Sequence, residues 1–228
     1  GVITGRPHRG GRTLGTRVSL HYGAVGAQSH GCPGRAWLPA LPPRKRAAVL
    51  RLRDPADRAA TLAGIALLAD ALRARGCAFD AARLRHPARG RPTLPGGPEF
   101  SIAHAAGLVA CAVADAPLGL DLEARGAVRA EQLRLVLSAD ERAAVDAGSL
   151  VPTDAWVMKE AVLKAAGQGI DVAREVALRG DAGVFRGREW RLVRVPLPDT
   201  HVAWLAVEAA VDGLELVAVD AAALPAAP

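Results

Sequence analysis

The order of helical and strand-like segments along the chain restricts the fold more than any other feature of the sequence. The longest helical pattern starts at Asp54-Pro55 and stops at Gly76. Its apolar residues recur at helical spacing and form a single stripe, made by Leu62, Ile65, Ala69 and Leu72. A shorter helix is expected just before it, within residues 41–53. The long segment therefore predicts a helix with one face packed on a core.

Strand-like runs follow this helix. They lie at residues 100–102, 108–114 and 118–123, and we expect a hairpin between the second and third, turning at Asp115-Ala116-Pro117. Two further segments predict helices, at 128–148 and 152–167. The chain closes with the alternating segments REWRLVRV, HVAWLAVEAAV and LELVAV, which are typical of antiparallel strands with one face in water.

This order predicts an α+β fold with two similar lobes related by a pseudo-twofold axis. Each lobe is expected to hold a small, mainly antiparallel sheet with packed helices, and the active site should lie in the cleft between them. Residues 1–35 show no sustained period, which predicts a weakly ordered N-terminal segment. We expect the first lobe at residues 36–116 and the second at 117–228.

Charge is unevenly distributed along the chain, whose formal net charge is +6. Residues 1–53 contain ten Lys and Arg and no acidic residue, whereas the remaining 175 residues contain 19 basic and 23 acidic side chains. This asymmetry indicates a polyanionic partner, which can be nucleic acid, a phosphorylated cofactor or an acidic protein. The alternative is that the arginines only keep a flexible tail in solution.

Compartment is indicated by what the sequence lacks. No apolar run approaches the roughly 20 residues needed to span a bilayer, and no signal pattern begins the chain. Cys32, Cys77 and Cys111 are widely spaced, which favours reduced thiols over disulfides or a zinc site. We therefore expect a soluble, cytoplasmic protein without membrane contact.

The motif LGLDLE places two carboxylates on one side of a strand. Asp121 and Glu123 alternate with Leu120 and Leu122, so the acids project to one side and the leucines to the other, into a core. Two such carboxylates can jointly hold a hard divalent cation such as Mg²⁺. A solvated strand edge is the alternative reading of this motif.

The motif WVMKEAVLK contains two of the three lysines in a chain with 29 Lys and Arg. Glu160 and Lys164 lie one helical turn apart and share a face, and Trp156 lies one turn earlier, where it can wall the same site. Lys159 points about 100° away from Glu160, so we expect it to face solvent or a phosphate. A surface ion pair is the alternative. Together with the strand acids, this helix offers three carboxylates and a lysine, enough for Mg²⁺ and a transferring phosphoryl group.

The third motif is ARGRPTLPGGPEFSIAH. Its Gly90-Arg91-Pro92 is expected to form a turn that presents a guanidinium group. His104 follows a strand-like run between this basic turn and the carboxylate strand, and it is either a ligand for a polar group or a structural histidine.

The blocks GRP, FSIAH, LGLDLE and WVMKEAVLK, in this order, resemble the signature blocks of the 4'-phosphopantetheinyl transferases. The match is to the single-chain, two-lobed type represented by the surfactin synthetase activator, and it covers roughly residues 37–210. The resemblance implies Mg²⁺-dependent transfer of the 4'-phosphopantetheine group from coenzyme A to a serine hydroxyl of an apo acyl or peptidyl carrier protein, with release of 3',5'-ADP. It also implies a role in fatty acid, polyketide or nonribosomal peptide biosynthesis, and one chain supplying both halves of the cleft suggests a monomer.

The resemblance assigns roles to individual residues. Asp121, Glu123 and Glu160 would ligate Mg²⁺, Lys164 would neutralise the pyrophosphate, and Glu160 or a water that it holds would take the proton from the serine. His104 would act in the active site as well as bind coenzyme A, together with Asp121 and Lys164. Further residues expected to bind coenzyme A are Lys45, Arg46, Arg51, Thr61, Gly90, Arg91 and Pro92. The sequence departs from the family pattern at Ala103, in place of the usual serine, and at Ala48, in place of a basic residue.

Two other functions compete with this one. A Mg²⁺-dependent phosphotransferase acting on another nucleotide would use the same acids, although the chain has no G-x-x-x-x-G-K-[ST] loop. A nucleic-acid-binding protein would rely on residues 1–53, but only Tyr22 and Trp37 supply aromatic rings there. No helix-turn-helix or zinc spacing occurs in the sequence, so we expect no nucleic acid partner.

Overall fold

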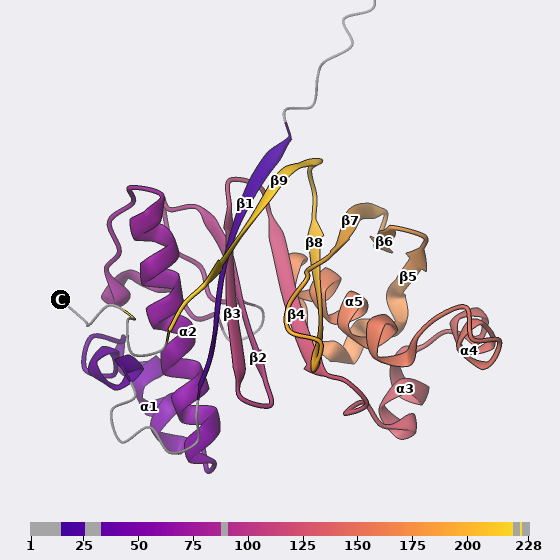
Figure 1. The fold of residues 1–228 in the computed structure, drawn as a ribbon, viewed down its shortest axis with the longest axis horizontal. Coiled ribbons are helices and arrows are strands. Elements are labelled where there is room, and N and C mark those ends of the chain that lie inside the picture. The colour runs from indigo at the N-terminus through magenta and orange to yellow at the C-terminus, as the bar shows by residue number, and fades with distance from the viewer. Residues whose placement is uncertain (1–14, 26–32, 88–90, 221–223, 225–228) are drawn as a thin grey trace, which may run out of the picture.

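The protein is an α+β fold in which two sheets lie between two long helices (Figure 1). The computed structural model describes residues 15–25, 33–87, 91–220 and 224. Helix α2 packs on the outer face of the first sheet and helix α5 on the outer face of the second, each with a hydrophobic core of its own. A third core fills the space between the two sheets. The predicted fold class is confirmed.

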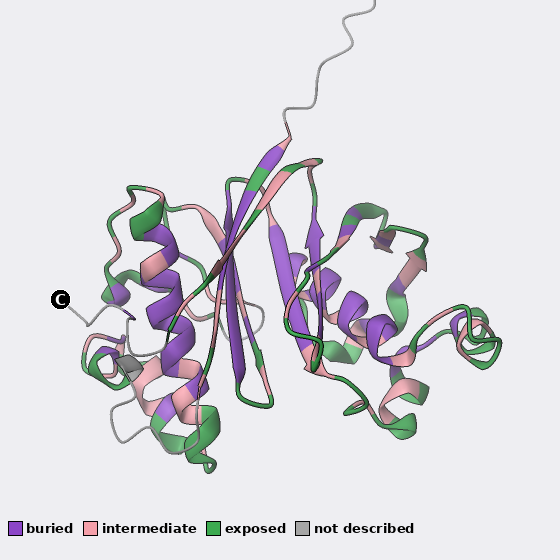
Figure 2. Cartoon of the chain, in the orientation of Figure 1, coloured by how far each residue is buried: buried purple, intermediate pink, exposed green. Residues whose placement is uncertain are grey.

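The first sheet has the strand order β2-β3-β1-β9. Strand β3 is buried along its whole length, because β1 and β2 flank it and cores cover both of its faces (Figure 2). The strands of this sheet are β1 (Thr16–Ala24), β2 (Glu99–Ala105), β3 (Leu108–Ala114) and β9 (Val211–Ala218). Its helices are η1 (Pro33–Trp37), α1 (Pro43–Arg51), α2 (Pro55–Ala74) and η2 (Ala81–Arg83).

The long helix follows the sequence pattern closely. Asp54 caps its first turn by accepting a hydrogen bond from the backbone N–H of Ala56, and Pro55 occupies the first helical position. Gly76 takes a φ of +71°, which ends the helix in the left-handed conformation that glycine adopts without strain. The expected apolar stripe is buried against the first sheet.

The hairpin predicted at Asp115-Ala116-Pro117 is wrong. Strand β3 pairs on its two edges with β1 and β2, while β4 (Leu118–Ala124) belongs to the other sheet. The hairpin instead joins β2 to β3 through Ala106 and Gly107, whose φ values are 44° and 81°. Two central residues with positive φ are the signature of the tight turn that matches strand twist.

Both ends of the chain contribute to the first sheet. We expected residues 1–35 to be weakly ordered, but residues 16–24 form β1, which is mostly buried. Strand β9 was expected to be antiparallel, yet it runs parallel to β1. Residues 1–14 and 26–32 lie outside the described residues, and the lobe boundaries at 35 and 116 stay a prediction.

The second sheet is antiparallel and has the strand order β4-β8-β7-β6-β5. The segment predicted as one helix at 128–148 is divided at Leu137-Ser138 into α3 and α4. The remaining strands are β5 (Val176–Arg179), β6 (Ala182–Phe185), β7 (Arg188–Arg194) and β8 (His201–Val207). The helices are α3 (Ala130–Val136), α4 (Ala139–Asp146), α5 (Pro152–Ala165) and η3 (Ile170–Glu175).

The lobes are joined through strands β2 and β4. The hydroxyl of Ser101, which is buried, accepts a hydrogen bond from the backbone N–H of Leu120 at 2.9 Å. The imidazole Nε2 of His201 lies 3.0 Å from the carbonyl oxygen of Ala105. These two contacts position β2, which carries His104, beside β4, which carries Asp121.

The predictions about cysteines and membrane-spanning segments can be compared with the described residues. Cys77 and Cys111 are free cysteines, while Cys32 lies outside the described residues. Among the helices that the structure describes, none has the length and apolar character that a bilayer crossing requires.

Candidate active site

The site is built where helix α5 lies directly on strand β4. Gly119 makes this possible, because a Cβ atom there would come within 2.1 Å of the carbonyl oxygen of Ala161 and 2.4 Å of the backbone N of Ala165. A glycine in a strand interior often marks such a close approach of two backbones. The contact fixes α5 against β4 two residues before Asp121.

Lys164 reaches across this contact to the strand. Its Nζ donates a hydrogen bond to Oδ1 of Asp121 at 2.7 Å, and the side chains are 28% and 12% exposed. Lys164 therefore forms its ion pair with Asp121 of the strand. This differs from the alternative considered for the motif, in which Lys164 would pair with Glu160 on the helix surface. Burial raises the pKa of Asp121, and the ammonium group opposes this rise.

Glu160 lies close enough to the strand acids to feel their charges. Burial raises the pKa of Glu160 to about 7, and the negative charges of Asp121 and Glu123 add to this effect while Lys164 opposes it. Residues distant in the sequence are thus brought together: the two acids of LGLDLE and both ends of the E-x-x-x-K motif. A carboxyl group that titrates near neutral pH can serve as a general base.

The three carboxylates fit a hard divalent cation by donor type and by charge. Oxygen ligands from Asp and Glu are those that Mg²⁺ takes in proteins. Burial and, after it, the charges of Asp121 and Glu123 raise the pKa of Glu160, and a bound cation relieves this repulsion between the acids. The oxygens are not converged, however: within the described ranges, no group of three or more His, Cys, Asp or Glu is placed to hold a metal ion. Oε1 of Glu123 accepts a hydrogen bond from the backbone N–H of the next residue, Ala124, at 2.9 Å.

A cavity of about 380 Å³ adjoins one of these acids, Glu123. Glu123 of the second lobe and His104 of the first both line it, together with Asp54 and Asp57 at the start of α2. Its volume is in the range of small-molecule sites. A hollow of about 500 Å³ beside β1 and β9 is lined by other residues, such as Arg17 and Arg75, and contains none of the predicted site residues.

Lys45 of the first lobe affects the pKa values of two histidines in this region. Partial burial, followed by the charge of Lys164, lowers the pKa of His104, and Lys45 adds to the effect while Asp57 opposes it. Burial lowers the pKa of Lys45 as well. His86, which we did not predict, has a pKa lowered to about 4 by burial and by the charge of Lys45. Lys45 therefore lies near both histidines.

The other predicted binding residues differ in how they are held. Arg91 donates a hydrogen bond to the carbonyl oxygen of Phe100 at 2.7 Å and forms an ion pair with Glu99, so its guanidinium is fixed beside β2. Arg46 donates to the carbonyl oxygen of Pro39 at 3.2 Å. Arg51 is exposed at the end of α1, Thr61 and Pro92 are half-buried, and Gly90 lies outside the described residues.

The expectation that Lys159 faces solvent or a phosphate is wrong. Its side chain is 0% exposed, and its Nζ lies 2.8 Å from Oε2 of Glu141. Burial lowers the pKa of Lys159, while the hydrogen bond and charge of Glu141 raise it. The helical spacing gave its direction relative to Glu160 but could not show that η3 and β5 cover that side.

A comparison with known families supports the assignment of this region. Residues 117–203 match the 4'-phosphopantetheinyl transferase superfamily. The matched segment runs from β4 into β8 and includes all three candidate metal ligands and Lys164. A search of curated proteins returned no match. Residues 117–203 are thus similar to this superfamily, which supports a transferase acting on phosphopantetheine.

Sequence reasoning missed several residues that shape the candidate site and the region around it. Gly119 stands in the quoted motif LGLDLE, and a glycine inside a strand pattern was the available signal. Ser101, in FSIAH, gave no such signal, because its partner is a backbone N–H on another lobe. Asp57 and His86 are polar residues whose importance comes only from the folded arrangement.

Proposed function

We propose that the protein transfers 4'-phosphopantetheine from coenzyme A to a serine of an apo carrier protein, in the manner of the two-lobed transferases. The observation that carries this proposal is the meeting of Asp121, Glu123, Glu160 and Lys164 within the matched segment. Three acids and one ammonium group, with Glu123 lining a cavity, suit a metal-assisted transfer of a phosphoryl-type group.

Asp121, Glu123 and Glu160 would hold the Mg²⁺ ion. The bound ion supplies charge neutralisation to the diphosphate of coenzyme A. The chain itself supplies the negative site: two acids from one face of β4 and one from α5, already near enough for their charges to interact. Because Asp and Glu side chains rotate freely at their ends, their oxygens can converge without movement of the backbone.

Lys164 would neutralise the remaining charge of the diphosphate. Its side chain keeps 28% of its surface exposed while it pairs with Asp121, so a ligand can reach part of this side chain. Its compact charge suits a crowded diphosphate site better than a planar guanidinium group does. Glu160, or a water that it holds, would take the proton from the serine hydroxyl, because a carboxyl group with a pKa of about 7 is about half ionised at neutral pH and is a stronger base than an ordinary carboxylate.

The nucleotide end of coenzyme A would bind to the first lobe. His104 lines the cavity and feels the charges of Lys45 and Lys164, which supports a phosphate site there. Arg91 is held beside the same strand by Glu99. Lys45 and His104 would act in place of the contacts that Ala48 and Ala103 cannot make, and the remaining candidates are Arg46, Arg51, Thr61, Gly90 and Pro92.

The carrier protein is the second substrate of the proposal. Carrier proteins of this kind tend to be acidic, which suits a chain with a net charge of +6. One chain supplies both sides of the cavity, so we propose a cytoplasmic monomer.

The test is the substitution Glu160→Gln, which keeps the size of the side chain and removes the base. With coenzyme A and Mg²⁺, the parent protein should add the mass of one phosphopantetheine group to an apo carrier protein. Glu160→Gln should lower the rate of this transfer by about 10²–10⁴-fold. The matched control is Glu189→Gln, an exposed glutamate on β7 of the same lobe, which should leave the rate unchanged.

Two results would contradict the proposal. If the Glu160→Gln protein transfers at the parent's rate, Glu160 is not the base of the reaction. If no fatty acid, polyketide or peptide-type carrier gains mass with the parent protein, carrier modification is wrong. Phosphoryl transfer to another acceptor under the same conditions would then identify a different phosphotransferase.

A further inference from the structure

We propose that Lys159 is a positioning residue: its buried contacts with Glu141, η3 and β5 fix the orientation of α5 that presents Glu160 and Lys164 to strand β4. The inference rests on the proposed function of those two residues and concerns what holds them in place. Nothing in the four sequence blocks assigns a role to this lysine.

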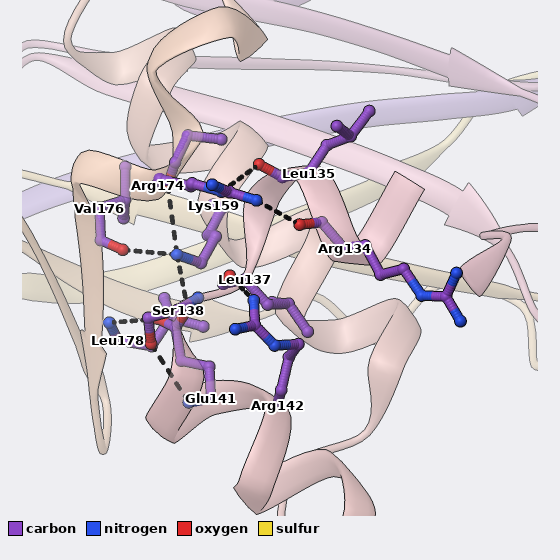
Figure 3. A network of polar contacts seen from close by, with 11 residues as sticks. Arg134, Leu135, Leu137, Ser138, Glu141, Arg142, Lys159, Arg174, Val176 and Leu178 are labelled. Atoms are coloured by element: carbon purple, nitrogen blue, oxygen red, sulfur yellow. Dashed lines mark hydrogen bonds and ion pairs between the residues drawn. The ribbon is translucent and has the colours of Figure 1, made fainter. Parts of the chain in front are cut away.

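Lys159 makes three polar contacts on the side of α5 that faces away from β4 (Figure 3). Its Nζ donates to the carbonyl oxygen of Val176 at 2.6 Å and to that of Ala173 at 3.2 Å, and it pairs with Oε2 of Glu141 at 2.8 Å. An ammonium group has three protons, and each has an acceptor here. The buried charge is therefore fully satisfied.

Glu141 carries the contact on to other elements. Its Oε2 also accepts from the N–H of Ser138 at 2.8 Å, and its Oε1 accepts from the N–H of Leu178 at 3.2 Å. Ser138 in turn caps helix α4, because its Oγ accepts from the N–H of Glu141 at 3.2 Å. One carboxylate thus joins α5, the start of α4 and strand β5.

The surrounding segments are fixed by arginines. Arg174 of η3 donates to the carbonyl oxygens of Arg134 at 2.6 Å and Leu135 at 2.9 Å, which ties η3 to α3 (Figure 3). Arg142 donates to the carbonyl oxygen of Leu137 at 2.8 Å. One of the carbonyls that Lys159 binds, that of Ala173, therefore belongs to η3, which hydrogen bonds hold against α3.

Helix α5 is consequently held on two sides. Gly119 lets its backbone lie directly on β4, and Lys159 attaches the opposite side to η3 and β5. Glu160 is the next residue in the helix, so any rotation of α5 at Lys159 moves the Glu160 carboxylate by a similar angle. A displacement of about 1 Å at a reacting group can lower a rate by about 10²-fold.

Two substitutions test the inference in the transfer assay. Lys159→Met keeps the length of the side chain and removes the ammonium group, and Glu141→Gln keeps the shape but replaces the ion pair with a neutral hydrogen bond. At a temperature where thermal unfolding shows each variant folded, we expect kcat to fall by about 10²-fold for Lys159→Met and by about 10-fold for Glu141→Gln. The KM for coenzyme A should change by less than kcat, because the nucleotide end would bind to the first lobe, which is unchanged, although Lys164 would move with α5.

Arg191→Met is the matched control. Arg191 pairs with Asp181 in the same lobe, but that pair is exposed, so its loss should leave kcat unchanged. A folded Lys159→Met protein with the parent's kcat overturns the inference. Loss of one partner of a buried ion pair can prevent folding; Glu141→Gln then decides, and full kcat in that variant overturns the inference as well.

A second readout separates this inference from the proposed function. In native-state hydrogen exchange, the amides of residues 156–165 should exchange at least 10-fold faster in Lys159→Met or Glu141→Gln than in the Arg191→Met control. If the parent protein transfers no phosphopantetheine, the proposed function fails, and this measurement still tests whether Lys159 holds α5. Unchanged exchange in both variants refutes the positioning role, whatever the activity.

Discussion

Replacing Gly119 with alanine tests the contact on which the site is built. The new Cβ atom would lie 2.1 Å from the carbonyl oxygen of Ala161, 2.4 Å from the N of Ala165 and 3.0 Å from the carbonyl carbon of Lys164. All three atoms are helix backbone, so no side-chain rotation can relieve the contact. Helix and strand must therefore separate.

The size of the effect follows from these distances. The Ala161 oxygen must move by about 1 Å before its contact reaches the shortest separation that packed atoms tolerate. Overpacking of this kind costs about 1–3 kcal/mol. For a chain of this length, a loss of about 2 kcal/mol lowers Tm by roughly 4–8 °C. The same movement of about 1 Å would draw Lys164 of α5 away from Asp121 of β4. We therefore expect the rate of transfer to fall by about 10²-fold.

Two other glycines provide controls for thermal unfolding and the transfer assay. Gly213 has no atom within 4 Å of an added Cβ, so Gly213→Ala should leave Tm and rate unchanged. Gly183 also faces α5, but the atoms near its added Cβ belong to side chains, and the one at short distance is Cγ2 of Val162 at 2.5 Å. Gly183→Ala should therefore lower Tm by less than Gly119→Ala.

The outcome that refutes this reasoning is a Gly119→Ala protein with the Tm and transfer rate of the parent. If Tm falls as expected while the rate is kept, the packing argument holds but the dependence of the site on this contact is wrong. If Gly213→Ala is equally damaging, the loss comes from glycine replacement in general rather than from contact with α5.

Two further predictions concern stability. Ser101→Ala leaves the buried N–H of Leu120 without its partner and should lower the free energy of unfolding by about 1–3 kcal/mol in denaturant titrations. Ser149→Ala, at an exposed hydroxyl, should change the free energy of unfolding by less than about 0.5 kcal/mol. Equal effects of the two substitutions would contradict the role of Ser101 in joining the two lobes. His86 has a pKa lowered to about 4, so the unfolded chain binds a proton between pH 6.5 and 4 that the folded protein does not, and stability should fall as pH drops through this window. Because the ring is half-exposed, we expect about 1 kcal/mol, absent in His86→Gln; the same pH slope in both proteins would argue against it.

The sequence was most informative where local patterns and neighbouring residues decide the structure. The boundaries of α2 follow from Asp54, Pro55 and Gly76, which act within one turn of the helix ends. The alternation in LGLDLE placed the acids and leucines of β4 on the correct faces. The meeting of these acids with Glu160 came from the resemblance, since strand and helix periodicity say nothing of which elements touch.

The errors have a common physical origin in long-range pairing. Strand β1 forms because β3 and β9 flank it, and neither partner is near it in the sequence. The hairpin was assigned to Asp115-Ala116-Pro117 because proline marks turns, but the edge of β3 that β4 would need is occupied by β1. Alternation alone cannot tell a parallel strand such as β9 from an antiparallel one.

The two lysines of helix α5 show why residue type and spacing do not suffice to assign function. Lys159 and Lys164 are five residues apart, which places them about 140° from each other around the helix. Both meet an acid, but Lys159 is fully enclosed and also binds two backbone carbonyls, whereas Lys164 donates a hydrogen bond to Asp121 and stays 28% exposed. An anionic ligand can compete for an accessible ammonium group, but it cannot displace carbonyls that belong to η3 and β5. We therefore expect Lys164, rather than Lys159, to exchange its partner when an anionic ligand binds, and the surroundings of each lysine are the reason.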